Sequence, residues 1–410
     1  MTSHEHALQP RHTLLAALAV LALALLSYSG RVVAQDVPPA PSPPVPAPPP
    51  PEPAPPPPEP TPPPEPEVNT YLNTVLVSNG VIPAPTIDAN LVNPWGMALA
   101  PDGPWWIANN ATQTATVYNG IGRKLPDLAN LPGGTNGPAN PTGLVFSGGQ
   151  DFVVSNGILT APARFIFAGM NGTLIGWSPD VDPANAIVTY DDAEGGAVYT
   201  GLTLAFNGTA NFLYAADFAN NKVDVFDGTF QKVTLPGAFT DPSLPPDYAP
   251  FGIQAVLTSS GQTEIYVTYA QREPDTAEET PGAGLGIVNV FDTQGNLLRA
   301  LIPAGGNLNA PWGVALAPGN FGIFGGLVLI GNFGDGTINA FDPNTGAFMD
   351  TLRDQAGQPI VIEGLWAIAF GNAQRQQPSN TLFYTAGAAG ETAGVFGRID
   401  PPRTIQVPLP

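Results

Sequence analysis

Residues 309–317 read Asn-Ala-Pro-Trp-Gly-Val-Ala-Leu-Ala, and variants of this stretch occur six times along the chain. The copies align on a small residue that follows the position of the Trp: Gly96, Gly143, Gly201, Gly252, Gly313 and Ala367. Successive copies are 47, 58, 51, 61 and 54 residues apart. Repetition with a period of about fifty residues indicates one supersecondary unit that is built six times.

Each copy contains three short segments with the composition of β-strands. In the fifth copy, apolar residues 314–317 follow the Gly, residues 327–330 read Leu-Val-Leu-Ile, and residues 338–342 read Ile-Asn-Ala-Phe-Asp. Aromatic and β-branched residues of this kind suit a pleated, half-buried surface. Most copies continue with a turn rich in Asn, Asp and Gly and a weaker fourth segment, such as residues 297–301. We therefore expect four short strands in each copy.

Six units of four antiparallel strands predict an all-β fold, a six-bladed β-propeller. One such sheet cannot bury both of its faces alone, so the blades must pack around an axis. The aligned small residue begins the innermost strand, where the blades converge and a Cβ would crowd the neighbouring blade. We expect the N-terminal strand at residues 73–78 to join the last blade and close the ring, which removes an exposed sheet edge. The alternative is a β-sandwich in which the spacing of the copies is coincidental.

The chain before the repeats has two distinct compositions. Residues 1–34 are typical of a secretory signal peptide, with a polar start, an apolar run at 13–26 and the small residue Ala34 before the expected cleavage point. The run is short for a membrane span, so we expect no stable span after cleavage, and an uncleaved anchor is the alternative. Residues 35–68 are a Pro-rich stalk, of which the 31 residues 37–67 are expected to be an extended spacer of up to roughly 90 Å at ~3.1 Å per residue. The propeller is predicted at 69–400 and a loose tail at 401–410.

The composition excludes most catalytic systems. The chain has no Cys, and its three His residues all lie at positions 4, 6 and 12, inside the predicted signal peptide. Ser-His-Asp and Cys-His systems and zinc sites with imidazole ligands are therefore excluded from the mature protein. The sequence also lacks a phosphate-binding loop and a Gly-rich motif that opens a helix. Metal-assisted hydrolysis by carboxylates and amides is the chemistry that remains.

The charge of the chain is strongly acidic. It has 33 acidic and 13 basic residues, and a formal net charge of −20. This balance argues against nucleic acid and anionic membrane surfaces as partners. It suits a secreted or extracellular protein, or one of the periplasm or cell wall, and we expect a monomer.

Polar residues recur at the two loops of each blade that open on the same face. Successive strands are antiparallel, so the loop before the innermost strand and the loop after the second strand meet at one mouth of the channel. The candidate binding residues at this mouth are Asn93, Asn140, Asn309 and Glu363 before innermost strands, and Asn109, Asn171, Asp217 and Asn332 after second strands. Asn and Asp also cap turns through bonds to the backbone, which is the structural alternative for each of them. Asp217 and Glu363 are the candidate metal ligands, and Ca²⁺ is the candidate ion, because it prefers oxygen ligands.

Two inserts interrupt the repeats. Residues 272–281 follow the second strand of the fourth copy and contain Glu273, Asp275, Glu278 and Glu279. We expect this insert to overhang the same mouth, either as a solvated loop or as a rim that attracts cations. Residues 150–162 lie between the first two strands of the second copy, and therefore on the opposite face.

Several motifs carry a family resemblance. Residues 223–227 read Val-Asp-Val-Phe-Asp, a strand that resembles those of NHL-type propellers. Residues 93–96, 140–146 and 396–399 are similar to motifs of an uncharacterised family of secreted propeller proteins, and the likeness covers about residues 71–400. This resemblance implies the propeller fold and export, and no established activity.

The lactonase relatives of this fold, of the gluconolactonase and paraoxonase type, hold a divalent ion at the channel mouth with Glu, Asn and Asp. Glu363, Asn332 and Asp217 have the matching chemistry, although their flanking motifs do not match. The His on which paraoxonase relies is missing, and the NHL-repeat lyases need His-bound zinc, so neither activity carries over.

The sequence favours an exported propeller that binds or scaffolds an unknown extracellular ligand or protein through one face of its channel. The alternative is a divalent-metal-dependent, lactonase-like hydrolase at the channel mouth. Whether the protein is an enzyme stays open at this point.

Overall fold

The computed structural model describes residues 68–258, 260–273 and 278–402. The predicted signal peptide, nearly all of the predicted stalk and most of the predicted tail lie outside these residues, so those boundaries stay predictions. Among the described residues, no helix combines the length and the hydrophobicity that crossing a bilayer requires.

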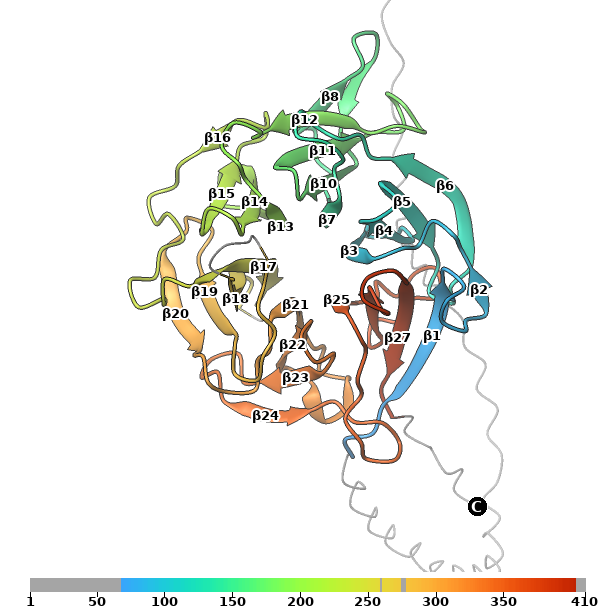
Figure 1. Cartoon of the computed structure of the whole chain (residues 1–410), viewed down its shortest axis with the longest axis vertical. Helices are drawn as coiled ribbons and strands as arrows, with labels where there is room; N and C mark the ends of the chain where they lie inside the picture. The colour runs from blue at the N-terminus through green and yellow to red at the C-terminus, as the bar shows by residue number, and fades with distance from the viewer. Residues whose placement is uncertain (1–67, 259, 274–277, 403–410) are drawn as a thin grey trace, which may run out of the picture. The chain divides into compact units, whose positions relative to one another are not determined.

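Six sheets of four antiparallel strands stand in a ring, as Figure 1 shows, and the predicted six-bladed propeller is confirmed. Blade 1 contains β3 (Pro94–Leu99), β4 (Trp105–Asn109), β5 (Thr114–Tyr118) and β6 (Lys124–Asn130). Blade 2 contains β7 (Pro141–Phe146), β10 (Phe165–Gly169), β11 (Thr173–Trp177) and β12 (Ile187–Asp191). Blade 3 contains β13 (Tyr199–Phe206), β14 (Asn211–Asp217), β15 (Lys222–Phe226) and β16 (Lys232–Val233).

The other three blades complete the ring. Blade 4 contains β17 (Tyr248–Leu257), β18 (Thr263–Gln271), β19 (Ile287–Phe291) and β20 (Leu297–Ile302). Blade 5 contains β21 (Pro311–Leu316), β22 (Val328–Asn332), β23 (Ile338–Phe341) and β24 (Phe348–Thr351). Blade 6 contains β25 (Leu365–Phe370), β26 (Leu382–Ala386), β27 (Val395–Asp400) and β1 (Leu72–Ser78).

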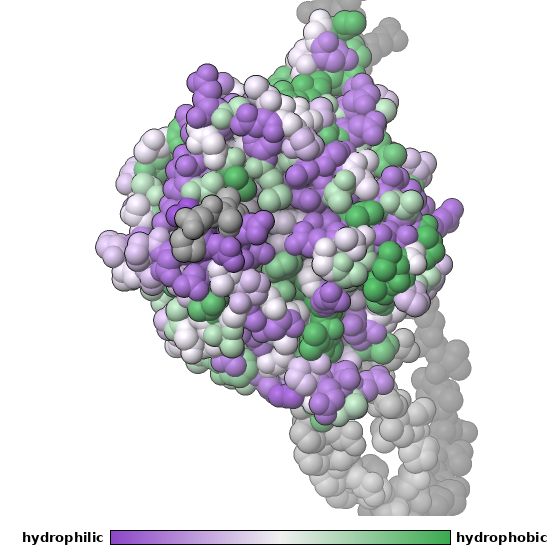
Figure 2. All heavy atoms as spheres, in the orientation of Figure 1, coloured by the Kyte–Doolittle hydropathy of each residue, from purple (hydrophilic) through white to green (hydrophobic). Residues whose placement is uncertain are grey.

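The remaining elements are short. β2 (Thr86–Ile87) pairs in parallel with β1, and β8 (Val153–Ser155) pairs with β9 (Thr160–Pro162) to form a hairpin within the predicted insert at 150–162. The 3₁₀ helix η1 (Gly322–Phe324) is the one helix in the described part of the chain. The face of the molecule seen in Figure 2 is mainly hydrophilic, with hydrophobic residues in separate patches.

The N-terminal strand closes the ring as predicted. β1 runs antiparallel to β27, from Leu72 opposite Asp400 to Ser78 opposite Val395. The hydroxyl of Tyr384 on β26 donates to Asn73 Oδ1 at 2.9 Å, which adds a side-chain link across this sheet. Because the first and last strands share one blade, the described chain presents no open edge between its first and last copies.

Hydrophobic side chains fill the spaces between neighbouring blades. One cluster joins blades 1 and 2, where the rings of Trp106 and Phe165 lie 4.6 Å apart. Another joins blades 3 and 4 and contains Tyr214 and Ile265. Each blade thus buries its two faces against its neighbours, which explains why a four-stranded unit is stable only in the ring.

The aligned small residues mark the closest approach between blades. A Cβ on Gly313 would lie 2.6 Å from the carbonyl oxygen of Trp366 on the next blade, and one on Gly252 would clash with the carbonyl oxygen of Trp312. The pairing of the innermost strand with the second strand shifts register beside this step in all six blades. A bulge of this kind bends the strand and changes the direction of its side chains.

We expect Gly252→Ala to destabilise the protein by on the order of 1–3 kcal/mol, because the added methyl group must displace the backbone of blade 5. Gly306→Ala is the matched control, since nothing lies within 4 Å of a Cβ at that position. Unfolding in urea measures both changes. Equal stability of the two variants would contradict the close approach of the blades.

Candidate functional site

The eight predicted binding residues lie at one end of the channel, which we call the polar end. The register pairs Pro94 at the start of β3 with Asn109 at the end of β4, and Pro311 with Asn332. The loops before the innermost strands and after the second strands therefore open on the same face, as the strand order predicts. The opposite end, where the innermost strands finish, is called the apolar end below.

Asn93 connects the surface of the polar end to its interior. Its Nδ2 donates to Glu391 Oε2 at 2.6 Å, and its Oδ1 accepts from Trp366 Nε1 at 3.0 Å. The backbone of Asn93 has a positive φ of 46°, a conformation that Asn tolerates better than most residues. The side chain is 3% exposed, so both of its polar atoms are used inside the protein.

The other asparagines of blades 1 and 2 also hold loops. Asn140, with a φ of 45°, exchanges two hydrogen bonds with the side chain of Gln113, at 2.8 and 2.9 Å. Asn109 is fully buried and its Nδ2 donates to the hydroxyls of two Thr residues on β5. Asn171 donates to the carbonyl oxygen of Gly137 at 3.0 Å.

In blade 5, Asn309 and Asn332 bond to each other and to the next turn. The backbone N–H of Asn309 donates to Asn332 Oδ1 at 3.2 Å, and Asn309 Nδ2 donates to Asp335 Oδ2 at 3.3 Å. Asn309 Oδ1 accepts from the N–H of Gly282 at 2.6 Å, which ties the residue directly after the insert at 272–281 to this blade. The side chains of Asn171, Asn309 and Asn332 thus bond to backbone groups, as the structural alternative expects, whereas those of Asn93, Asn109 and Asn140 bond to other side chains. The role of the six asparagines in binding stays a prediction.

The two candidate metal ligands lie in different places. Asp217 ends β14 in blade 3, whereas Glu363 precedes β25 in blade 6, and Figure 1 shows these strands on opposite sides of the ring. Glu363 is exposed and its Oε1 accepts from the N–H of Ala389 at 3.0 Å. The structure therefore does not bring this pair of carboxylates together around one ion.

Asp217 instead belongs to an acidic triad between blades 2 and 3. Carboxylate oxygens of Asp192, Asp217 and Asp224 lie within 4.8 Å of one another. Burial raises the pKa of Asp217. Lys232 Nζ lies 2.8 Å from Asp192 and 2.7 Å from Asp224, and Lys222 Nζ lies 2.9 Å from Asp224. The two ammonium groups already supply positive charge to these carboxylates.

An aromatic cluster closes the channel beneath the polar end. It consists of Trp95, Phe251, Trp312, Trp366 and Phe333, and the first four directly precede the aligned small residue of their copies. The rings of Trp95 and Trp366 stack 3.5 Å apart, and those of Trp366 and Phe333 stack 4.2 Å apart. None of those four side chains is more than 9% exposed, so they fill the channel beneath the predicted mouth.

Carboxylates gather at the polar end around the insert. Burial, and then the carboxylates of Glu391, Glu278 and Glu273, raise the pKa of Glu279 to about 7. Burial also raises the pKa of Glu391, followed by the charge of Glu278, while the bond from Asn93 lowers it. The expected position of the insert over this end of the channel agrees with these neighbours, because Glu391 belongs to blade 6.

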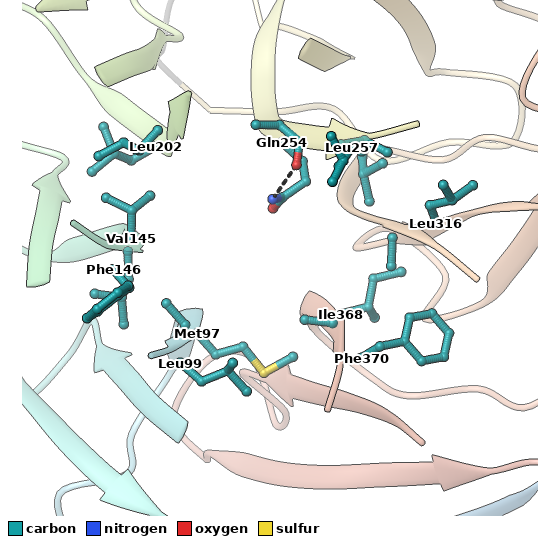
Figure 3. Close-up of a pocket in the computed structure, with 18 of the residues that line it drawn as sticks. Met97, Leu99, Val145, Phe146, Leu202, Gln254, Leu257, Leu316, Ile368 and Phe370 are labelled. Atoms are coloured by element: carbon teal, nitrogen blue, oxygen red, sulfur yellow. Dashed lines mark hydrogen bonds between the residues drawn. The ribbon is translucent and has the colours of Figure 1, made fainter. Parts of the chain in front are cut away.

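A cavity of about 610 Å³ occupies the apolar end. The innermost strands of all six blades line it, and Figure 3 shows their side chains around an open centre. The lining residues are Met97, Ala98, Leu99, Pro101, Trp105, Leu144, Val145, Phe146, Leu202, Leu204, Gln254, Ala255, Val256, Leu257, Val314, Ala315, Leu316, Ile368, Ala369 and Phe370. None of them is charged, and Gln254 is the single amide among them.

Beyond this cavity, the channel narrows toward the aromatic cluster. A second space of about 40 Å³ is lined by Gly96, Gly143 and Gly313, and by Gln254 and Trp312 among others. The small residues that let the blades converge therefore also form the floor of the cavity. Trp312, a member of the aromatic cluster, lies at the inner end of this space.

Sequence reasoning missed this cavity, although a signal for it was present. In five copies the residues one and three positions after the small residue are both large and apolar, as in Met97 and Leu99 or Ile368 and Phe370. The fourth copy alone places an amide between them, at Gln254. Composition alone does not distinguish the part of each strand that faces the channel from the part that packs between blades.

We expect Glu279→Gln to make the protein more stable than the wild type at pH 8, by on the order of 1 kcal/mol. The folded-state pKa is raised above the ordinary value of 4.5, so the contribution of Glu279 to stability is complete below about pH 4.5 and is lost as the pH rises through about 7. Urea unfolding at pH 5 and pH 8 measures this difference, which should shrink at pH 5. Glu194→Gln, which removes an exposed carboxylate elsewhere, is the control. A difference that does not change with pH would contradict the raised pKa.

No family model matches the chain. Comparisons with solved structures and with known sequences do find similar proteins. The solved structures with a similar fold include virginiamycin B lyase from Staphylococcus aureus, with a TM-score of 0.46 and 12% identity over 81% of this chain and 99% of that one. Another is an α-L-arabinanase from Penicillium chrysogenum, with a TM-score of 0.49 and 13% identity over 80% and 98% of the two chains. Similarity at this level does not extend to function.

Two proteins of Acanthamoeba polyphaga mimivirus are similar in sequence. Uncharacterized protein L690 is 31% identical over 340 residues, which cover 81% of this chain and 86% of the relative. Uncharacterized protein R648 is 32% identical over 337 residues, which cover 81% of this chain and 80% of the relative. The chain therefore belongs to the same family as these two uncharacterized mimivirus proteins.

Proposed function

We propose that the protein is an exported, NHL-like propeller that binds a small apolar ligand in the cavity at the apolar end of its channel. The observation that carries this proposal is the cavity itself, whose volume of about 610 Å³ lies in the range of small-molecule sites. Its walls come from six strands that also form the cores between blades, so the site is preformed. Export rests on the predicted signal peptide and the acidic composition.

Binding rather than catalysis follows from the chemistry of the walls. The lining residues include no carboxylate, no Lys or Arg and no His, so they offer no acid, no base and no charged metal ligand. Burial of an apolar ligand contributes roughly 25 cal/mol per Å² of surface removed from water. A large apolar molecule therefore gains affinity here without polar contacts, whereas the predicted polar mouth offers mainly groups that already have partners.

The alternative function is a divalent-metal-dependent hydrolase, and the acidic triad of Asp192, Asp217 and Asp224 favours it. Ca²⁺ would have to displace Lys222 and Lys232 from these carboxylates, and the triad lies between two blades, away from the cavity. A rise in melting temperature with Ca²⁺ that Asp217→Asn abolishes would favour this alternative. No such rise would leave the apolar cavity as the functional site.

We expect the wild type to bind the neutral fluorescent probe N-phenyl-1-naphthylamine in the cavity. The double substitution Gln254→Trp with Leu257→Trp should weaken binding at least tenfold, because both side chains are exposed toward the cavity and two indoles would occupy much of it. Fluorescence titration measures the dissociation constants.

The matched control places two Trp at Ile158 and Leu159, which are exposed in the turn of the β8–β9 hairpin and do not line the cavity. This control should bind the probe as the wild type does. Equal binding by both double variants, or no binding by the wild type, would refute the proposed function.

A further inference from the structure

Gln254 is an exception in an otherwise apolar wall. It lies on β17, its side chain is exposed to the cavity, and Figure 3 shows it reaching toward the open centre. The equivalent positions in the other five copies are Ala98, Val145, Thr203, Ala315 and Ala369. A long amide here is not needed to pack blades, because the other copies pack without one.

The hydrogen bonds of Gln254 leave part of its amide free. Its Nε2 donates to the carbonyl oxygen of Ala255 at 3.1 Å, and no other bond of this side chain exists within the described protein. An amide carries two N–H groups and an acceptor oxygen with two lone pairs. Gln254 therefore presents one donor and one acceptor to whatever occupies the cavity.

We propose that the ligand is a neutral, largely apolar molecule with one hydroxyl group, and that Gln254 recognises this hydroxyl. The inference rests on the proposed function and specifies its ligand class. A hydroxyl both donates and accepts, so it can satisfy Oε1 and the free N–H of Nε2 together. Gln254 is then the residue that determines specificity, while the apolar wall supplies most of the contact area.

Other ligand classes fit the same wall less well. A carboxylate would lose its hydration without any cationic partner among the lining residues, and an ammonium group would find no carboxylate there. A hydrocarbon would displace water from Gln254 and leave both of its free polar groups without a partner. A site built around a hydrogen-bonding group discriminates strongly against analogues that lack the group.

The geometry of the channel also orients such a ligand. Gln254 lines both the large cavity and the narrow space of about 40 Å³ beneath it. That space is close to the volume of one water molecule, so it suits a hydroxyl rather than a bulky apolar group. The hydroxyl would lie where the cavity narrows, and the hydrocarbon part would extend past Phe146, Leu257 and Phe370 toward the open side.

Competition with bound N-phenyl-1-naphthylamine tests this inference with three ligands of one chain length: 1-decanol, decane and decanoate. We expect 1-decanol to displace the probe from the wild type at a concentration at least tenfold below that needed with the other two. Gln254→Leu keeps an apolar wall of similar size, and it should weaken 1-decanol about tenfold while decane binds as well as before or better.

Gln358→Leu is the control, because Gln358 is exposed in an outer turn of blade 5 and should change none of the three affinities. If the probe binds and the three ligands compete equally, or Gln254→Leu leaves the preference for 1-decanol unchanged, the inference is refuted and the proposed function stands. If no ligand competes, or the wild type does not bind the probe, the proposed function itself fails.

Discussion

The close approach of neighbouring innermost strands is the constraint on which the rest of the structure depends. At the aligned small residue, the backbone of one blade lies where a side chain of the preceding blade would otherwise begin. Side-chain hydroxyls strengthen the same contact: Thr142 donates to the carbonyl oxygen of Tyr199 at 2.7 Å, and Thr200 donates to that of Phe251 at 2.8 Å. Backbone contact and hydrogen bonds together fix the spacing and angle of the blades.

This constraint also divides the channel into two chemically different halves. Residues before the small residue are aromatic in four blades, and they stack across the axis and close the polar end. Residues after it are aliphatic in most blades, and they surround a cavity that the converging strands leave open. One repeated sequence motif thus builds both the aromatic cluster and the apolar cavity. The residues before and after the small residue face different parts of the channel axis.

The fold could be predicted from the sequence because its causes are periodic. The repeated Gly, the alternation of short strands with Asn- and Gly-rich turns, and the strand before the first copy all appear in the sequence, and they predicted six blades and ring closure by residues 73–78. The site was harder to predict, because it depends on the direction in which each side chain points. Whether Trp95 or Met97 points into the channel depends on a bulge in the pairing of β3 with β4, and composition does not show a bulge.

At the polar end, the partners of the predicted residues could not be predicted from the sequence either. Asn93 and Asp217 were recognisable as polar residues at strand ends, but their neighbours Glu391 and Asp192 come from other blades, and the sequence does not reveal that they lie beside them. Gln254 was visible as an unusual residue only after the cavity was known.

The crystal structure of the protein with 10-bromo-1-decanol tests the central claim most directly. The account predicts an anomalous bromine signal in the apolar cavity with the hydroxyl at Gln254, and a bromine signal at the polar end beside Asn93 would contradict it.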